Sequence, residues 1–222
     1  MRSRNIFMIV LLCLSTGAAH AELGVGIHAS TLGLGADCVL ELQHQLNIRG
    51  TVNTLSRSFD GEESGNDYTF DLSLFSVGGM VDYHIFDGGF RLSGGVLLNS
   101  NAADMEAEVT VTEDYEIGGQ TYSASEVGLF TGEMEFSSLA PYAGIGWGNA
   151  VGVTKSLGLM LDLGVAFQGS PTIALGTRTQ LPNAQAQQEL EENLRAEEAD
   201  LEDEISEFTL YPVVSLGLTY RF

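Results

Sequence analysis

The last fifteen residues of the chain alternate between apolar side chains and smaller or more polar ones. The apolar positions are Phe208, Leu210, Pro212, Val214, Leu216, Leu218, Tyr220 and Phe222. The same period of two recurs in residues 48–53, 90–98 and 159–168. Successive side chains of a β-strand point to opposite faces, so this period predicts strands with one apolar face. A soluble β-sandwich and a membrane β-barrel both produce it, and alternation alone does not separate them.

Two further features favour the membrane barrel. The connections between predicted strands alternate in length, with short or moderate ones at residues 43–45, 86–89 and 149–156 and long ones at 60–67, 101–131 and 182–206. Outer-membrane barrels have short turns on the periplasmic side and longer loops outside. The short-turn side also carries aromatic residues suited to a membrane interface, namely Tyr83, Trp147, Tyr220 and Phe222.

Three segments carry a family resemblance: residues 82–99, residues 139–150 (LAPYAGIGWGNA) and residues 211–222 (YPVVSLGLTYRF). They resemble small outer-membrane β-barrel proteins of Gram-negative bacteria, the class of short barrels that includes the OmpA transmembrane domain and opacity-type proteins. The resemblance covers residues 22–222 and implies an all-β, antiparallel up-and-down transmembrane barrel in the cell outer membrane. It also implies that the C-terminal strand, which ends on Phe222, is presented to the barrel-assembly machinery.

The first 21 residues predict a signal peptide. Two arginines precede an apolar run over residues 6–14 that is too short to cross a bilayer, and Ala19-His20-Ala21 fits the cleavage rule. We expect cleavage before Glu22. Cys13 then leaves with the signal peptide, and Cys38 alone cannot form an internal disulfide or a zinc site. No later stretch approaches eighteen uninterrupted apolar residues, so no transmembrane helix is expected.

The number of strands depends on residues 22–42. Apolar residues occupy odd positions up to Ala29 and even positions from Leu32. A hairpin near residues 31–35 explains the change with eight strands, whereas a β-bulge explains it with seven. Since single-chain bacterial barrels have even strand numbers, we predict eight. Gly169-Ser170-Pro171 is interpreted as a kink within one long strand that protrudes outward.

Charged residues of both signs fall on the predicted inward parity. They are Glu41, Arg49, Asp82, Arg91, Asp162 and Arg221. An eight-strand barrel is just wide enough for side chains to fill it. We therefore expect the opposite charges to form a plug, with a narrow cation-selective channel as the alternative.

His28 and Ser30 raise the alternative of a lipid-modifying enzyme. Residues i and i+2 of a strand share a face, so the imidazole and the hydroxyl can meet. The spacing resembles the His-x-Ser of lipid A deacylases, but it lies in a different strand region and the sequence identifies no supporting acid. His44 and His84 fall in predicted periplasmic turns, where an imidazole is usually solvated. We therefore predict that the protein is not an enzyme.

Acidic residues dominate the charge. The chain has 30 acidic and 9 basic residues and a net charge of −21. Nucleic-acid binding needs clustered Lys and Arg, so a general nucleic-acid binder is excluded. Lys155 is the one lysine, which excludes a polybasic membrane-surface patch. Of the acidic residues, 23 lie in or beside the three long connections.

The third long connection predicts an acidic helical insertion at residues 183–206, outside the barrel. Asn183 is a suitable N-cap for a helix over residues 184–205, although Ala186 leaves the capping box incomplete. Apolar residues form one stripe of this helix, interrupted by Glu198: Leu190, Leu194, Leu201 and Ile205. The helix is interpreted as a solvated lid over the barrel mouth or as a partner-binding helix.

The first long connection resembles half of an EF-hand calcium loop. Oxygen ligands at positions 1, 3, 5, 7 and 12 would come from Asp60, Glu62, Ser64, Asn66 and Asp71. A glycine-rich hairpin tip is the alternative, because no flanking helices are expected and an aspartate replaces the usual glutamate. The second long connection, centred on residues 117–121, predicts a hairpin beyond the membrane.

Together these features predict a non-enzymatic outer-membrane barrel with a structural or surface-interaction role. We expect its acidic loops to meet divalent cations or lipopolysaccharide outside the cell. Apart from weak binding of Ca²⁺ or Mg²⁺, no cofactor is expected.

Overall fold

The computed structural model describes residues 22–63, 66–85, 88–108, 114–123, 126, 128–151, 157–178, 181 and 183–222. The predicted signal peptide, residues 1–21, lies outside this part of the chain, so its cleavage before Glu22 stays a prediction.

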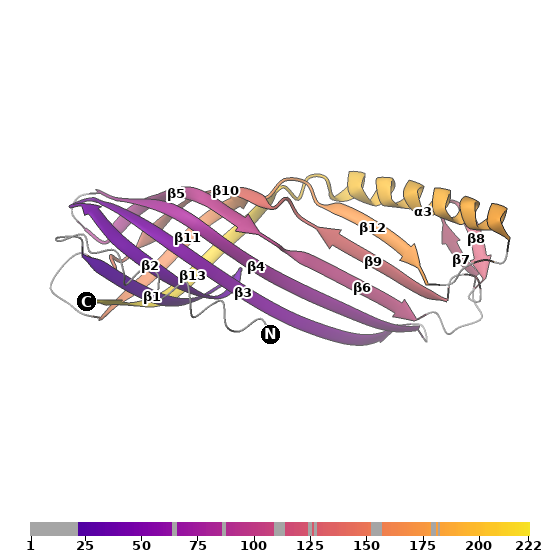
Figure 1. Cartoon of the computed structure of the whole chain (residues 1–222), viewed down its shortest axis with the longest axis horizontal. Helices are drawn as coiled ribbons and strands as arrows, with labels where there is room; N and C mark the ends of the chain where they lie inside the picture. Colours follow the sequence, from indigo (N-terminus) through magenta and orange to yellow (C-terminus); the bar gives the residue numbers. More distant parts are fainter. Residues whose placement is uncertain are drawn as a thin grey trace.

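Eight antiparallel strands close into a barrel (Figure 1). They are β1 (Leu23–Ser30), β2 (Gly33–Gln43), β3 (Leu46–Glu63), β4 (Asn66–His84), β5 (Phe90–Asn99), β10 (Leu139–Trp147), β11 (Leu157–Phe167) and β13 (Leu210–Arg221). The order around the ring is β4-β3-β2-β1-β13-β11-β10-β5, and pairing of β5 with β4 closes it. Closure gives every strand of the ring two neighbours, which is what a lipid environment demands of backbone polar groups.

The hairpin predicted near residues 31–35 is confirmed, and with it the count of eight strands. Ser30 pairs with Gly33 across a turn formed by Thr31 and Leu32. The turn is held to β13, since the Thr31 hydroxyl donates to the carbonyl oxygen of Pro212 at 2.9 Å. The Tyr211 hydroxyl in turn donates to the Thr31 carbonyl at 2.7 Å. The β1–β2 hairpin therefore ends level with the start of β13.

The barrel is apolar outside and mostly polar inside. Large side chains of alternate positions face outward, among them Leu159 and Leu216 with exposed fractions of 69% and 61%. The intervening positions are buried, as Asp162 and Thr219 are. So much exposed apolar surface is unfavourable in water and suits lipid, which decides between the barrel and the soluble sandwich. The predicted aromatic residues of the short-turn end are all exposed: Tyr83, Trp147, Tyr220 and Phe222.

Opposite the short turns, the sheet continues beyond the barrel as an open extension (Figure 1). The outer part of β4 pairs with β6 (Ala102–Glu108), β6 with β9 (Leu129–Glu135), and β9 with β12 (Thr172–Thr177). The extension thus consists of the outer parts of β3 and β4 together with β6, β9 and β12. Gly169-Ser170-Pro171, predicted as a kink within one long strand, instead separates two strands, since β11 pairs within the barrel and β12 pairs with β9 in the extension.

Much of the two acidic connections predicted as long loops is strand instead. The β3–β4 hairpin runs on to a pairing of Glu63 with Asn66. Its outer part alternates aromatic and acidic residues, and Phe59 and Phe70 pair across the strands with ring centroids 6.3 Å apart. Cross-strand aromatic pairs stabilise a sheet, and this alternation overrides the loop character that many carboxylates suggest.

A helix and a small hairpin cover part of the extension. The helix α3 (Ala184–Ile205) has the predicted bounds, and the amide of Gln185 donates to the Asn183 side chain at 3.0 Å. It lies along β12, with the hairpin of β7 (Asp114–Ile117) and β8 (Gln120–Ser123) near one end (Figure 1). A shared apolar cluster joins these elements: Ile117, Tyr122, Phe130, Leu175, Leu181, Leu190 and Leu194. Within the described residues, no helix combines the length and apolar character needed to cross a membrane.

The predicted hairpin at residues 117–121 is confirmed as β7–β8. Gly118 and Gly119 form its turn with φ of +57° and +78°, which favour glycine. A Cβ on Gly118 would come within 2.7 Å of the Asn193 carbonyl oxygen, so glycine also permits the close approach of α3.

Candidate functional site

An apolar layer fills the lumen near its outer mouth. Its seven buried members come from five strands and one turn: Leu32, Met80, Leu97, Ala140, Tyr142, Ala166 and Val213. This layer separates the polar interior of the barrel from the extension.

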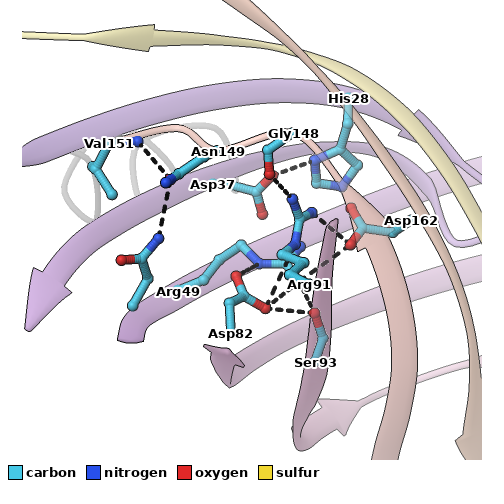
Figure 2. A network of polar contacts seen from close by, with 11 residues as sticks. His28, Asp37, Arg49, Asp82, Arg91, Ser93, Gly148, Asn149, Val151 and Asp162 are labelled. Carbon is cyan, nitrogen blue, oxygen red and sulfur yellow. Dashed lines mark hydrogen bonds and ion pairs between the residues drawn. The ribbon is translucent and has the colours of Figure 1, made fainter. Parts of the chain in front are cut away.

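Below this layer, two arginines and two aspartates form a buried network (Figure 2). Arg49 binds Asp82 through two hydrogen bonds, Nε to Oδ2 at 2.8 Å and Nη2 to Oδ1 at 3.0 Å. Arg91 donates to Asp162 at 2.6 Å, and Arg49 reaches the same Asp162 oxygen at 3.4 Å. Ser93 donates to Asp82 at 2.6 Å, and Arg91 also donates to the carbonyl of Gly148. The two positive and two negative charges balance one another, so the predicted plug is present.

Two members of the predicted plug lie elsewhere. Arg221 pairs with Glu22 at 3.1 Å at the periplasmic end of the barrel, and both side chains are partly exposed. Glu41 is half-buried near the end of β2. Both lie on strand ends, where the lumen opens to water, so neither joins the buried network.

His28 is held by a second buried group. Its Nδ1 lies 2.9 Å from Asp37 Oδ2, and its Nε2 lies 2.7 Å from Asn53 Oδ1. The Asn53 amide nitrogen donates to Ser76, which directs the Asn53 oxygen at the ring. Both ring nitrogens thus face acceptors, an arrangement that a doubly protonated imidazole satisfies with two N–H groups. That state also balances the charge of Asp37.

The structure does not bring His28 and Ser30 together as a catalytic pair. The Ser30 hydroxyl donates to the Gly33 carbonyl at 3.1 Å and accepts from the Leu32 amide at 3.2 Å, so it serves the turn. Asp37 is the acid that the sequence analysis did not identify, although it lies on the inward parity of β2. His84, expected in a solvated turn, is 2% exposed at the periplasmic end.

Glycines leave room for both buried groups. A Cβ on Gly146 would lie 2.8 Å from Asp162 Oδ1 and 2.9 Å from the Arg91 guanidinium. A Cβ on Gly35 would overlap the His28 ring. Small inward residues on some strands therefore make space for large inward residues on their neighbours.

One small cavity lies in the described part of the lumen. It has a volume of about 30 Å³, lies between the apolar layer and the network, and is lined by His28, Arg49, Tyr142, Asp162 and Ser215, among others. Its volume suits about one water molecule, and its wall combines these polar side chains with apolar ones such as Met80 and Val213. On the periplasmic side, Val39, Ala150 and Val151 form a further buried cluster. Across the described strands, side chains fill the lumen in layers.

The extension presents a second concentration of charge, on its outer surface. Residues that pair directly across antiparallel strands point to the same face. The registers place nine exposed carboxylates on the face that continues the outside of the barrel, here called the acidic face: Asp60, Glu62, Asp67, Asp71, Asp104, Glu106, Glu108, Glu133 and Glu135. Asp71, Asp104 and Glu133 stand side by side on three neighbouring strands. Within the described residues, one ion pair involves this face, between Arg178 and Glu106 at 2.9 Å.

The opposite face of the extension packs under α3, which docks through carboxylates as well as apolar residues. Glu198 accepts from the backbone amide of Leu175 at 2.7 Å, and Glu202 accepts from that of Ile173 at 2.9 Å. Both amides belong to β12, the edge strand of the extension. Glu197 accepts from the Gly118 amide at 3.2 Å. Glu198, which interrupts the predicted apolar stripe, therefore caps a strand edge.

The predicted calcium ligands lie on the β3–β4 hairpin. Asp60, Glu62 and Asp71 share the acidic face, and Asp60 accepts from the Thr69 hydroxyl at 3.4 Å. Ser64 lies outside the described residues, and the structure does not describe the side chain of Asn66. Among the residues that are described, no three Asp, Glu, His or Cys side chains are grouped as a metal site. Metal binding here stays a prediction.

Comparison with known proteins supports the fold. No protein-family model matches the sequence, and no curated protein matches it. The structure is similar to CarO of Acinetobacter baumannii, with a TM-score of 0.56 and 18% identity over 90% of this chain and 98% of that one. CarO2 of the same organism gives a TM-score of 0.57 at 18% identity, with the same coverage of 90% and 98%. A major outer membrane protein of Thermus thermophilus covers 91% of this chain and 98% of its own at 14% identity, with a TM-score of only 0.38. The chain has the fold of a small outer-membrane β-barrel, as the sequence resemblance implies.

Proposed function

We propose that this protein is a closed, non-enzymatic outer-membrane barrel that holds an acidic sheet outside the cell. On this proposal the acidic face gathers divalent cations and, through them, contacts the phosphates of lipopolysaccharide. The observation that carries it is the set of nine exposed carboxylates on one face of the extension.

The spacing of these carboxylates supports a role for cations. Directly opposed residues of an antiparallel pair have Cβ atoms about 4.5–5.5 Å apart, and like charges at that distance repel. Asp71, Asp104 and Glu133 occupy three such positions in a row. Ca²⁺ and Mg²⁺ bind carboxylate oxygens and relieve the repulsion. Because these side chains are exposed and not grouped around one point, weak binding with little discrimination between the two cations is expected.

The lumen supports a role that does not depend on conduction or catalysis. Its charges are paired, its outer end is apolar, and Ser30 is directed at a turn rather than at His28. The contribution of the barrel is then to anchor the extension at the membrane surface.

The proposal is tested by removing charge from the acidic face and measuring calcium binding. Residues 22–222 are refolded in detergent, and calcium is titrated by calorimetry into the parent and into the triple variant Asp71→Asn, Asp104→Asn, Glu133→Gln. The matched control, Glu189→Gln, Glu192→Gln, Asp200→Asn, removes the same charge from exposed positions of α3. We expect the face variant to lose most calcium binding and the control to keep it.

Two results would count against the proposal. Equal loss in both variants would show that calcium responds to net charge rather than to this face. The second result concerns the association of lipid A with the barrel in vesicles that contain lipid A. If sodium supports this association as well as calcium does at matched ionic strength, the cations act only by screening charge.

A further inference from the structure

The extension has two edge strands, which differ in whether another element covers them. At the β12 edge, α3 lies alongside the strand and Glu198 and Glu202 accept hydrogen bonds from its outward amides. Such capping is a standard way to keep an exposed edge from pairing with another chain.

The other edge, the outer part of β3, is left open. β2 pairs with β3 only as far as Leu34 opposite Thr54, because the β1–β2 hairpin turns back at Thr31 and is tied to β13. On its other side, β3 stays paired with β4 out to Glu63. Within the described part of the chain, residues 55–63 therefore have a neighbour on one side only. Nine residues of strand span about 30 Å and direct every second N–H and C=O toward the open side.

The side chains of this edge differ between its two faces. Asp60 and Glu62 belong to the acidic face. The opposite face carries Phe59, which is 56% exposed and packs against Phe70 with the two rings tilted by 40°. It also carries the exposed Arg57, which forms no ion pair or hydrogen bond with the described residues. The edge thus offers backbone hydrogen bonds flanked by negative charge on one face and an aromatic surface on the other.

These charges select among strands that might pair with the edge. A second copy of the chain would bring its own Asp60 and Glu62 beside the same residues, which repel it. A strand with basic residues on that face and apolar residues on the other complements both faces.

We propose that residues 55–63 of β3 bind an extended segment of another polypeptide, which adds to the sheet as a strand. Its side chains alternate between basic residues, which lie beside Asp60 and Glu62, and apolar residues, which pack on Phe59. The inference rests on the proposed function in one respect, that the extension is an interaction surface outside the cell. Backbone pairing supplies affinity, and the two faces supply selectivity.

The test uses refolded residues 22–222 and an octapeptide of alternating lysine and valine, with a glutamate–valine octapeptide as control. Amide hydrogen exchange is followed by NMR over residues 55–63. At a peptide concentration ten times the dissociation constant, we expect exchange to slow about tenfold at every second amide, because only alternate amides face the added strand. The glutamate peptide should leave exchange unchanged.

Two charge-reversal variants locate the binding. Asp60→Lys with Glu62→Lys should weaken binding of the lysine–valine peptide about tenfold. The reason is that two cross-strand pairs of opposite charge become pairs of like charge. Asp104→Lys with Glu133→Lys makes the same change on interior strands of the same face and should have little effect.

Three outcomes would overturn the inference. Peptide binding that both variants weaken equally, without alternating amide protection, would place the peptide on the acidic face and not at the edge. Protection of residues 55–63 that grows with protein concentration in the absence of peptide would mean that a second copy pairs there. No binding would reject the edge as a site. The calcium titration remains an independent test of the proposed function in each case.

Discussion

The lumen and the outer face of the extension both concentrate carboxylates, but they differ in what surrounds those carboxylates. In the lumen, Asp82 and Asp162 are buried and each binds arginine directly. On the acidic face, Asp71 and Asp104 are exposed and stand beside each other across two strands. Strand β4 contributes to both sets, with Asp82 inside and Asp71 outside.

The difference follows from the cost of burying charge. A buried carboxylate inside a membrane barrel is tolerated only when a partner compensates the loss of water, and Asp37, Asp82 and Asp162 each have one. Water solvates the exterior carboxylates, which can remain without basic partners and stay available to cations or to other molecules. The lumenal charges therefore serve the fold, and the exterior charges are free to serve an interaction.

Replacing one arginine of each region should separate the two roles most strongly. Arg49→Met leaves Asp82 buried without its main partner, and we expect the free energy of unfolding to fall by about 3–5 kcal/mol. Arg178→Met removes the exposed pair with Glu106 and should change it by about 0–1 kcal/mol. Urea unfolding of the two variants in lipid vesicles measures both. Similar losses in the two would refute the distinction.

A smaller effect is expected from filling the space beside the buried network. Gly146→Ala places a Cβ against Asp162 and Arg91 and should destabilise the barrel by about 1–3 kcal/mol. Gly94→Ala is the matched control, since its Cβ would meet no protein atom within 4 Å. The same unfolding measurement should show no loss for Gly94→Ala. A stable Gly146→Ala protein would mean that the network shifts without cost.

Two carboxylates outside the barrel, those of Glu198 and Glu202, hold α3 against β12. Their removal should affect hydrogen exchange near β12 and not in the barrel. Glu198→Ala with Glu202→Ala deletes the acceptors for the Leu175 and Ile173 amides, each hydrogen bond to a charged group contributing about 1.5–3 kcal/mol. We expect faster hydrogen exchange of these two amides and little change in the barrel strands. Glu189→Ala with Glu192→Ala, on the exposed side of α3, provides the control. Unchanged exchange in the first variant would show that apolar packing alone holds the helix.

The smallest effect concerns calcium and α3. The last turn of the helix carries Glu202, Asp203 and Glu204, where the helix dipole disfavours negative charge, and it has no basic residue. Millimolar calcium should therefore raise the helicity and protease resistance of residues 182–207. Limited proteolysis in chelator, in calcium, and in sodium of matched ionic strength measures this. If sodium protects this segment from proteolysis as well as calcium does, the protection comes from charge screening and not from a cation site.

The alternation of the sequence predicted strands and the inward direction of Arg49, Asp82, Arg91 and Asp162. It is a local property that fixes the face of each residue. The barrel and its eight strands also needed the alternating lengths of the connections and the even strand number of single-chain barrels. The bounds of α3 were also predictable, because Asn183 and the apolar stripe are local signals. Partner choice was not predictable, since Asp162 meets two arginines only through the order and register of the strands.

The acidic extension was the harder region to read. Phe59 to Glu62 and Tyr68 to Asp71 do alternate as strands do, yet their carboxylates suggested a loop. The edge-capping role of Glu198 depends on β12, which is distant in sequence, and no local pattern marks it. The pairing of Asp37 with His28 could have been predicted, because the inward parity of Asp37 on β2 places both side chains on the inner side of the barrel wall.

The central claim, that lumenal carboxylates stabilise the fold whereas those of the acidic face repel one another until cations bind, is tested by one pair of variants. Urea unfolding of Asp162→Asn and Asp104→Asn is compared in lipid vesicles, first with chelator and then with millimolar calcium. We predict that Asp162→Asn lowers the unfolding midpoint in both conditions. Asp104→Asn should match or exceed the parent in chelator and lose that advantage in calcium. A midpoint for Asp104→Asn that falls in chelator as it does for Asp162→Asn would contradict the account.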